Sequence, residues 1–169
     1  TLHYLNLLSS LINKGSSGNK SYTANWTAIT YSITINLVGG SVSTANKTSY
    51  TIETATFSLN NPTKSGHTFV GWTGTGLSAA SKSVSIAKGS TGNKSYTANW
   101  KIVDYTVTLE PNGGSVTPTT ITVNYGKAYG EIPTPTRSGY TFVGWYKETG
   151  FTNLVDEETI VNTASAHKL

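Results

Sequence analysis

The sequence predicts a β-rich α+β fold, built from small tandem modules with mostly antiparallel strands and little helix. Three observations support this prediction. Of the 169 residues, 29 are Thr and 20 are Ser, and the β-branched side chain of Thr favours strands over helices. Apolar and polar residues alternate with a period of two, as in strands with one buried face. Several segments also recur 73 or 74 residues later, which indicates a repeat architecture.

Two pairs of segments carry most of the repeat signal. Residues 14–26 read KGSSGNKSYTANW and residues 88–100 read KGSTGNKSYTANW, so they differ at one position in thirteen. Residues 66–72 read GHTFVGW and residues 139–145 read GYTFVGW, so they differ at one position in seven. Because the matches keep the same order and nearly the same spacing, we interpret them as copies of one module.

A third pair sets the phase of the repeat, because residues 31–42 (YSITINLVGGSV) match residues 105–116 (YTVTLEPNGGSV). The matches predict three units: the C-terminal part of a truncated repeat (1–26), a complete repeat module (27–100) and a repeat module lacking its last strand (101–169). In this phase, His167–Leu169 fall where Asn93–Ser95 lie one repeat earlier. Residues 1–8 match no other unit.

The first strand of each full unit is predicted from its alternation. Apolar residues occupy every second position from Ile29 to Ile35 and from Val103 to Leu109. Each run leads to a glycine pair that allows a turn with φ > 0, at residues 39–40 and 113–114.

The remaining strands are predicted more loosely. Further strands are expected near residues 50–52 and 121–125, at the aromatic blocks with Phe69 and Phe142, and at residues 84–86 and 96–100. The links at 62–66 and 135–139 begin with Pro, which cannot donate to a central sheet, so one short helical turn is possible there.

The four tryptophans have two interpretations. They could form a platform on which sugar rings stack, or they could belong to the core of each module. Their regular recurrence within the alternating pattern favours the core, since each large aromatic side chain can remove ~150–250 Å² from water. The residues are Trp26, Trp72, Trp100 and Trp145.

These residues together resemble the internalin-type B-repeat, also called the Listeria–Bacteroides repeat. The resemblance rests on an opening alternating strand (105–109), an Asn-Gly-Gly turn (112–114), a Pro-Thr-Arg-Ser-Gly link (135–139), the block GYTFVGW (139–145) and a closing YTANW strand (96–100). Residues 27–100 depart from the pattern at Leu37-Val38, where a turn-forming pair is usual, and at His67, where Tyr is usual.

The resemblance implies a small β-grasp-like module, strung in tandem in secreted or wall-attached bacterial proteins. It also implies a role in stalks or adhesins, and the pattern contains no catalytic residues. We therefore expect an extracellular location, at the bacterial cell surface or in the cell wall. No run approaches the ~18 apolar residues that span a bilayer, so no membrane insertion is expected. Residues 1–8 are apolar but too short for a signal peptide, so we expect any export signal outside these 169 residues.

Charge is distributed unevenly along the chain. Residues 1–100 contain seven Lys and one carboxylate (7 − 1 = +6), whereas residues 101–169 contain five Lys or Arg and seven Asp or Glu (5 − 7 = −2). The basic part could bind a glycan or another anionic polymer, or its lysines could simply be solvated. No Arg cluster or basic run is present, so nucleic acid is not an expected partner.

The residues needed for catalysis or metal binding are scattered. His3, His67 and His167 lie far apart, and Glu53 is the only acid among the first 100 residues. The acidic run 156–158 could attract calcium, but no ion-binding loop surrounds it. The sequence has no Cys for thiol ligation. We therefore assign no catalytic, cofactor-binding or metal residues and expect a protein that is not an enzyme.

The function predicted from these observations is a stalk or spacer in an adhesin. The expected partners are neighbouring repeats, with any host or cell-surface glycan or protein bound through other parts of the parent chain. Two alternatives remain open. The first is a module that binds glycan or anionic polymer, and the second is a self-associating filament subunit, since incomplete units leave open strand edges.

Overall fold

The computed structural model describes residues 17–19, 21 and 23–169, and all regular elements in this part of the chain are β-strands. The eleven strands are β1 (Tyr31–Asn36), β2 (Ser49–Tyr50), β3 (Phe57–Ser58), β4 (His67–Gly74), β5 (Ser85–Ile86), β6 (Lys94–Ile102), β7 (Asp104–Thr108), β8 (Thr120–Asn124), β9 (Trp145–Tyr146), β10 (Leu154–Val155) and β11 (His167–Lys168). The β-rich prediction is confirmed. The α component of the predicted α+β fold is wrong for the described residues, which contain no helix.

The proline-containing link at 62–66 explains the missing helical turn. Thr63 forms a β-bridge with Ser41, and Lys64 forms one with His67 across a tight turn. Backbone groups that a helical turn would have used internally are therefore paired with neighbouring segments. In the second link, Thr136 forms the equivalent bridge with Ser115.

The strands form four sheets. One sheet has the order β2-β1-β6-β4 and a small one pairs β3 with β5, while the later part of the chain forms the sheets β11-β7-β8 and β10-β9. Five of the seven strand pairs are antiparallel, and β1–β6 and β7–β11 are parallel. The prediction of mostly antiparallel strands is thus confirmed.

The register of the parallel pairs corrects one detail of the repeat alignment. Lys94 lies opposite Ile33, and His167 lies opposite Val107, which is the counterpart of Ile33 one repeat later. His167–Leu169 therefore correspond to Lys94–Tyr96, and the predicted correspondence with Asn93–Ser95 is wrong by one position. The insertion or deletion that causes the shift lies in the loops, where pattern matching has little to align.

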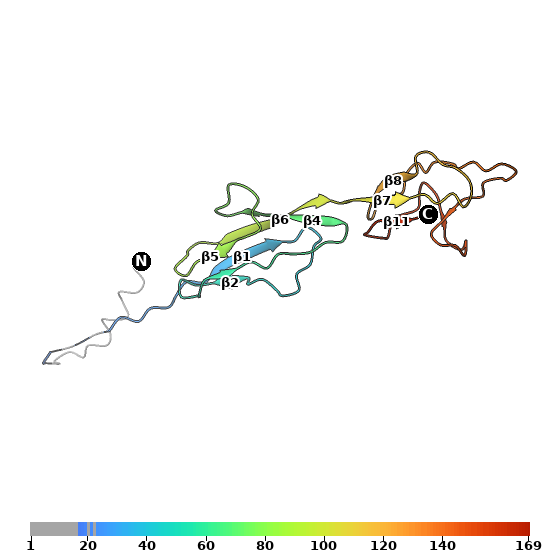
Figure 1. Ribbon diagram of the computed structural model, residues 1–169. Helices are drawn as coiled ribbons and strands as arrows, with labels where there is room; N and C mark the ends of the chain where they lie inside the picture. The colour runs from blue at the N-terminus through green and yellow to red at the C-terminus, as the bar shows by residue number, and fades with distance from the viewer. Residues whose placement is uncertain (1–16, 20, 22) are drawn as a thin grey trace.

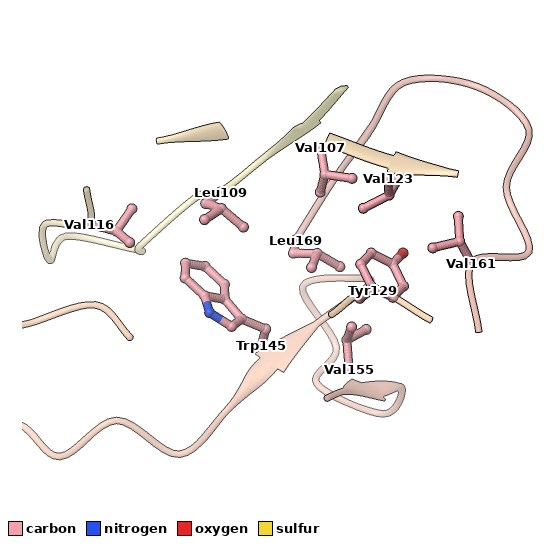
Figure 2. Packing of buried hydrophobic residues seen from close by; sticks show 9 residues of the cluster. All are labelled: Val107, Leu109, Val116, Val123, Tyr129, Trp145, Val155, Val161 and Leu169. Atoms are coloured by element: carbon pink, nitrogen blue, oxygen red, sulfur yellow. The ribbon is translucent and has the colours of Figure 1, made fainter. Parts of the chain in front are cut away.

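Two separate hydrophobic cores follow from the two sets of strands. The first contains Ile33, Tyr50, Leu59, Trp72, Val84, Ile86, Tyr96 and Ala98. The second is drawn in Figure 2, where the Tyr129 ring lies among Val123, Val155, Val161 and Leu169, with the Trp145 indole beside Leu109. We call the bodies around these cores the first module (residues 31–102) and the second module (residues 104–169). Figure 1 shows them end to end.

Candidate functional site at the module junction

The connection between the modules is nearly continuous strand. β6 ends at Ile102 and β7 begins at Asp104, so Val103 alone separates them. The Val103 N–H donates a 2.9 Å hydrogen bond to the carbonyl oxygen of Gly66 in the first module. Figure 1 shows β6 leading directly into β7. A connection with one intervening residue, itself hydrogen-bonded, leaves few free dihedral angles for bending.

A close contact at Gly66 joins the modules a second time. Gly66 has φ +69° and occupies the third position of the turn from Lys64 to His67, where a positive φ favours glycine. A Cβ built on Gly66 would lie 2.5 Å from the Cβ of Tyr125 in the second module. Tyr125 thus rests directly on the backbone of Gly66, in space that any larger residue would fill.

Around this contact lies a cleft of about 880 Å³ with walls from both modules. The first module contributes the glycine turn, the proline-containing link and the ring of Trp100, and the second contributes Tyr125, Gly126 and Lys127. The basic groups in the walls are Lys64, His67 and Lys127, and no carboxylate lines the cleft. The site is therefore electropositive and partly aromatic.

The wall formed by Lys64 and Trp100 is held in place by several contacts. The Lys64 ammonium donates to the carbonyl of Val38 at 3.1 Å and lies 5.9 Å from the centroid of the Trp100 ring. The Trp100 indole N–H donates to the carbonyl of Leu37 at 3.1 Å. Phe69 packs edge-on against Trp100 with 5.4 Å between ring centroids. The side chains of Lys64 and Trp100 are half-buried, so their orientations are set before any ligand binds.

The histidines considered in the sequence do not form a common site. His67 lines the junction cleft and contacts the carbonyl of its neighbour Ser65 at 2.9 Å through Nδ1. His167 lies in the second module, where Nε2 is 2.6 Å from the Tyr129 hydroxyl and Nδ1 is 3.0 Å from the Ser165 carbonyl. Both of its ring nitrogens have partners, so we assign His167 a structural role. His3 lies outside the described residues.

The carboxylates of the second module hold turns together. Glu148 accepts hydrogen bonds from the Thr152 hydroxyl (2.6 Å), from the backbone N–H groups of Thr152 and Asn153, and from the side-chain amide of Asn153. These bonds lower the pKa of Glu148 to about 2, and the bond from the Thr152 hydroxyl has the largest effect. Hydrogen bonds from the hydroxyl and backbone N–H of Thr159 likewise lower the pKa of Asp156. In the described part of the chain, no three His, Cys, Asp or Glu residues gather as potential metal ligands.

The tryptophans divide into three groups. Trp72 and Trp145 are buried core residues, as predicted, and their indole N–H groups donate to the Asn61 side chain and the Pro133 carbonyl. Trp100 is half-buried at the junction. Trp26 is 87% exposed, so the core prediction is wrong there. Within the described residues, no segment covers Trp26 in the way that Leu37 and Phe69 cover Trp100.

A second hollow of about 950 Å³ lies over the aromatic block of the second module. Tyr140, Phe142, Val143 and Phe151 are exposed there, and the Arg137 guanidinium stacks 4.0 Å from the centroid of the Tyr140 ring. In the first module, β6 covers the corresponding surface by pairing with β4. We therefore interpret this hollow as the position of a closing strand, and we take the junction as the candidate binding site.

Sequence reasoning considered His67 and Trp100 individually but did not bring them together with Lys64, Tyr125 and Lys127. Tyr125 continues the odd-numbered alternation of β8, which suggests a core residue. It lies one position beyond the strand and is half-buried against Gly66 of the other module. Nothing in the alternation distinguishes a residue that faces its own core from one that faces a neighbour.

Comparison with known protein families identifies a repeat domain. The model of the Listeria-Bacteroides repeat domain matches twice, at residues 31–98 and 105–169. The two matched segments follow the two hydrophobic cores and together cover most of the chain.

Several bacterial proteins contain related sequence. Two are from Evansella cellulosilytica and are named as membrane proteins: one, described as Gly-rich, is 32% identical over 80% of this chain, and the other is 35% identical over 59%. Internalin H of Listeria monocytogenes is 34% identical over 50% of this chain. Each match spans 15% of the relative's own length. No solved structure matches the chain significantly. Within the described residues, no helix has the length and apolar character needed to cross a membrane.

Proposed function

The chain belongs to the Listeria–Bacteroides repeat family, and from this premise we propose that it is a spacer segment of a larger bacterial surface protein. The family is a repeat domain rather than an enzyme family. Related sequence also occurs in internalin H and in relatives named as membrane proteins, whose length is several times that of the matched region. In this proposal the chain is not an enzyme and the parent protein is extracellular at the cell surface or wall. The assignment of residues 1–26 to a preceding repeat stays a prediction, since most of them lie outside the described residues.

The observation that carries the proposal is the junction. A spacer needs a constant length per module and resistance to bending. Three features of the junction support a fixed angle between the modules. Val103 is the only residue between β6 and β7, its N–H is hydrogen-bonded to Gly66, and Tyr125 contacts Gly66. Adhesion by the parent protein would then depend on other domains held away from the surface.

Residual dipolar couplings measured on the whole chain test this proposal. We expect the couplings of both modules to fit one alignment tensor, because the junction fixes their relative orientation. Tyr125→Ala should loosen the junction and give two different tensors. Tyr140→Ala is the matched control, since Tyr140 is exposed and does not line the junction cleft. Two different tensors in the unaltered chain would contradict a stiff spacer.

The exposed aromatic block of the second module favours one other function, self-association into filaments. An apolar surface beside a strand without a pairing neighbour is a site at which chains associate. Sedimentation equilibrium over a wide range of protein concentration distinguishes the two. A constant monomer mass supports the spacer, whereas a mass that rises steadily with concentration supports the filament.

A further inference from the structure

The junction cleft has a composition suited to a ligand, which a spacer does not require. It brings together two lysines from different modules, Lys64 and Lys127, beside the aromatic rings of Trp100 and Tyr125. Small polar residues, including Ser41, Thr63 and Ser65, fill the wall between them. Ligand sites commonly combine aromatic faces with a few convergent polar groups in this way.

The positive charge of the lysines in the cleft favours the binding of an anion. The titratable wall residues of the cleft are Lys64, Lys127, His67 and Tyr125, and no Asp or Glu lines it. The ammonium group of Lys64 has three N–H groups, and one of them donates a hydrogen bond to the carbonyl oxygen of Val38. The others can reach a ligand, and the cation stays beside the Trp100 ring without reorganisation.

The aromatic and hydroxyl groups narrow the class of anion. A flat apolar ring such as Trp100 offers a surface for the C–H face of a pyranose ring, and hydroxyl and backbone groups match sugar hydroxyls. Nucleic acid is less suited, because recognition of phosphates and bases draws heavily on arginine, and no Arg lines the cleft. The size of the cleft, about 880 Å³, is in the range of ordinary ligand sites.

We propose that the junction cleft binds an acidic polysaccharide. A sugar ring lies against Trp100 and Tyr125, and a carboxylate or sulfate on the sugar is held by Lys64 and Lys127. Neither module has both lysines, so the site exists only where two modules are joined. The inference goes beyond the spacer role but rests on the fixed junction proposed for it, and a bound saccharide would stiffen the junction further.

Titration of the whole chain with acidic hexasaccharides tests the proposal. The probes are a heparin-derived hexasaccharide, which carries sulfates, and a hyaluronan hexasaccharide, which carries carboxylates. Maltohexaose serves as the neutral sugar and inorganic polyphosphate as the anion without sugar rings. We expect both acidic sugars to shift the amide signals of residues 63–67 and 125–127 and the indole signal of Trp100. Maltohexaose and polyphosphate should bind about tenfold or more weakly.

Charge-matched variants separate a defined site from diffuse attraction. Lys64→Gln with Lys127→Gln should weaken binding about tenfold, because both direct partners of the anion are lost. Lys82→Gln with Lys88→Gln removes the same charge outside the cleft and should leave affinity within about twofold at physiological salt. Lys127→Gln alone, on an exposed loop, provides a variant expected to fold normally and to lose part of the affinity.

Several results would overturn the proposal. Equal losses in the two double variants would reduce it to diffuse electrostatics, and polyphosphate binding as tight as that of heparin would remove the sugar from the recognition. Absence of binding by the unaltered chain would also refute it. If dipolar couplings show a fixed junction and no saccharide binds, only this inference fails. If they show a flexible junction, the spacer proposal fails as well.

Discussion

The two modules contain almost the same aromatic block in two different structures. In the first module, GHTFVGW forms most of the eight-residue strand β4, which pairs with β6 from His67 to Gly74. In the second, GYTFVGW is irregular up to Gly144, and β9 contains only Trp145 and Tyr146. One substitution in seven residues does not explain this contrast. The block becomes a long strand where a closing strand lies beside it.

The same comparison explains the different exposure of the phenylalanines. Phe69 packs edge-on against both Trp72 and Trp100, with 5.4 Å between ring centroids in each pair. Phe142 packs against Trp145 at 5.6 Å but is 40% exposed. In the described part of the second module, no residue takes the place of Trp100. The closing strand therefore supplies both hydrogen bonds and the second half of an aromatic sandwich.

The largest expected loss of stability comes from replacing the two core tryptophans. Trp72→Ala should lower the free energy of unfolding of the first module by about 3–5 kcal/mol, because the ring is completely buried and hydrogen-bonded to Asn61. Trp145→Ala should fall near the lower end of that range, since the exposed Phe142 beside it can move into the space. Denaturant unfolding monitored by NMR follows each module separately. Losses below 1 kcal/mol in both variants would refute the assignment of these residues to the cores.

The next effect concerns glycines at equivalent positions, Gly71 and Gly144. A Cβ on Gly71, which has φ +150°, would lie 2.7 Å from the backbone nitrogen of Ser81, so Gly71→Ala should cost about 2–4 kcal/mol. A Cβ on Gly144 would meet mainly the end of the flexible Leu154 side chain, so Gly144→Ala should cost less than about 1 kcal/mol. Thermal unfolding of the two variants checks the order. Equal costs would mean that the second block is as tightly paired as the first.

Extending the chain should convert the second module into a copy of the first. By register, Leu169 corresponds to Tyr96, so adding Thr-Ala-Asn-Trp after Leu169 supplies the counterpart of residues 97–100. We expect residues 140–146 to become a strand and Phe142 to be buried. The burial of Phe142 should raise the free energy of unfolding of the second module by about 1.5–3 kcal/mol.

Hydrogen exchange of the amides of residues 140–146 measures this effect. Extension with Thr-Asp-Asn-Ser is the control, because it lacks the apolar Ala and Trp side chains. Similar protection in both extended chains would show that backbone pairing alone orders the block.

The smallest effect is a difference in acid sensitivity. The Glu148 pKa is lowered from 4.5 to about 2 by hydrogen bonds from Thr152 and Asn153, so the folded state favours the carboxylate. Its contribution to stability is complete above the unfolded pKa and disappears as pH falls from about 4.5 towards 2. The first module has only one acid, the exposed Glu53. Acid should therefore loosen the second module selectively.

NMR titration of the Glu148 carboxyl carbon checks the pKa directly. Glu148→Gln should flatten the response of the 148–153 turn to pH, and Glu53→Gln is the matched control in the first module. An ordinary pKa at Glu148 would mean that the hydrogen bonds to Thr152 and Asn153 do not persist in solution.

Much of the fold could be predicted because it depends on local sequence pattern. The alternation at Ile29–Ile35 and Val103–Leu109 predicts β1 and β7, although β1 begins only at Tyr31 and Ile29 is exposed. The family resemblance is confirmed by two matches of the family model. The short helical turn considered possible for the proline-containing links is not formed, because local sequence does not decide between turn types there. Pro and Gly positions are compatible with several turns, and bridges to distant residues decided between them.

The sequence by itself determined the strand character, the repeat period, the family and the burial of Trp72 and Trp145, because alternation and recurrence are properties of neighbouring residues. Only the tertiary structure decided that one aromatic block is a long strand and the other is not, that Trp26 is exposed, and that Tyr125 rests on Gly66. Each of these depends on a contact with residues distant in the sequence, or on the lack of one. Strand pairing and burial are satisfied by whichever segment lies alongside, so nearly identical local sequences can take different structures.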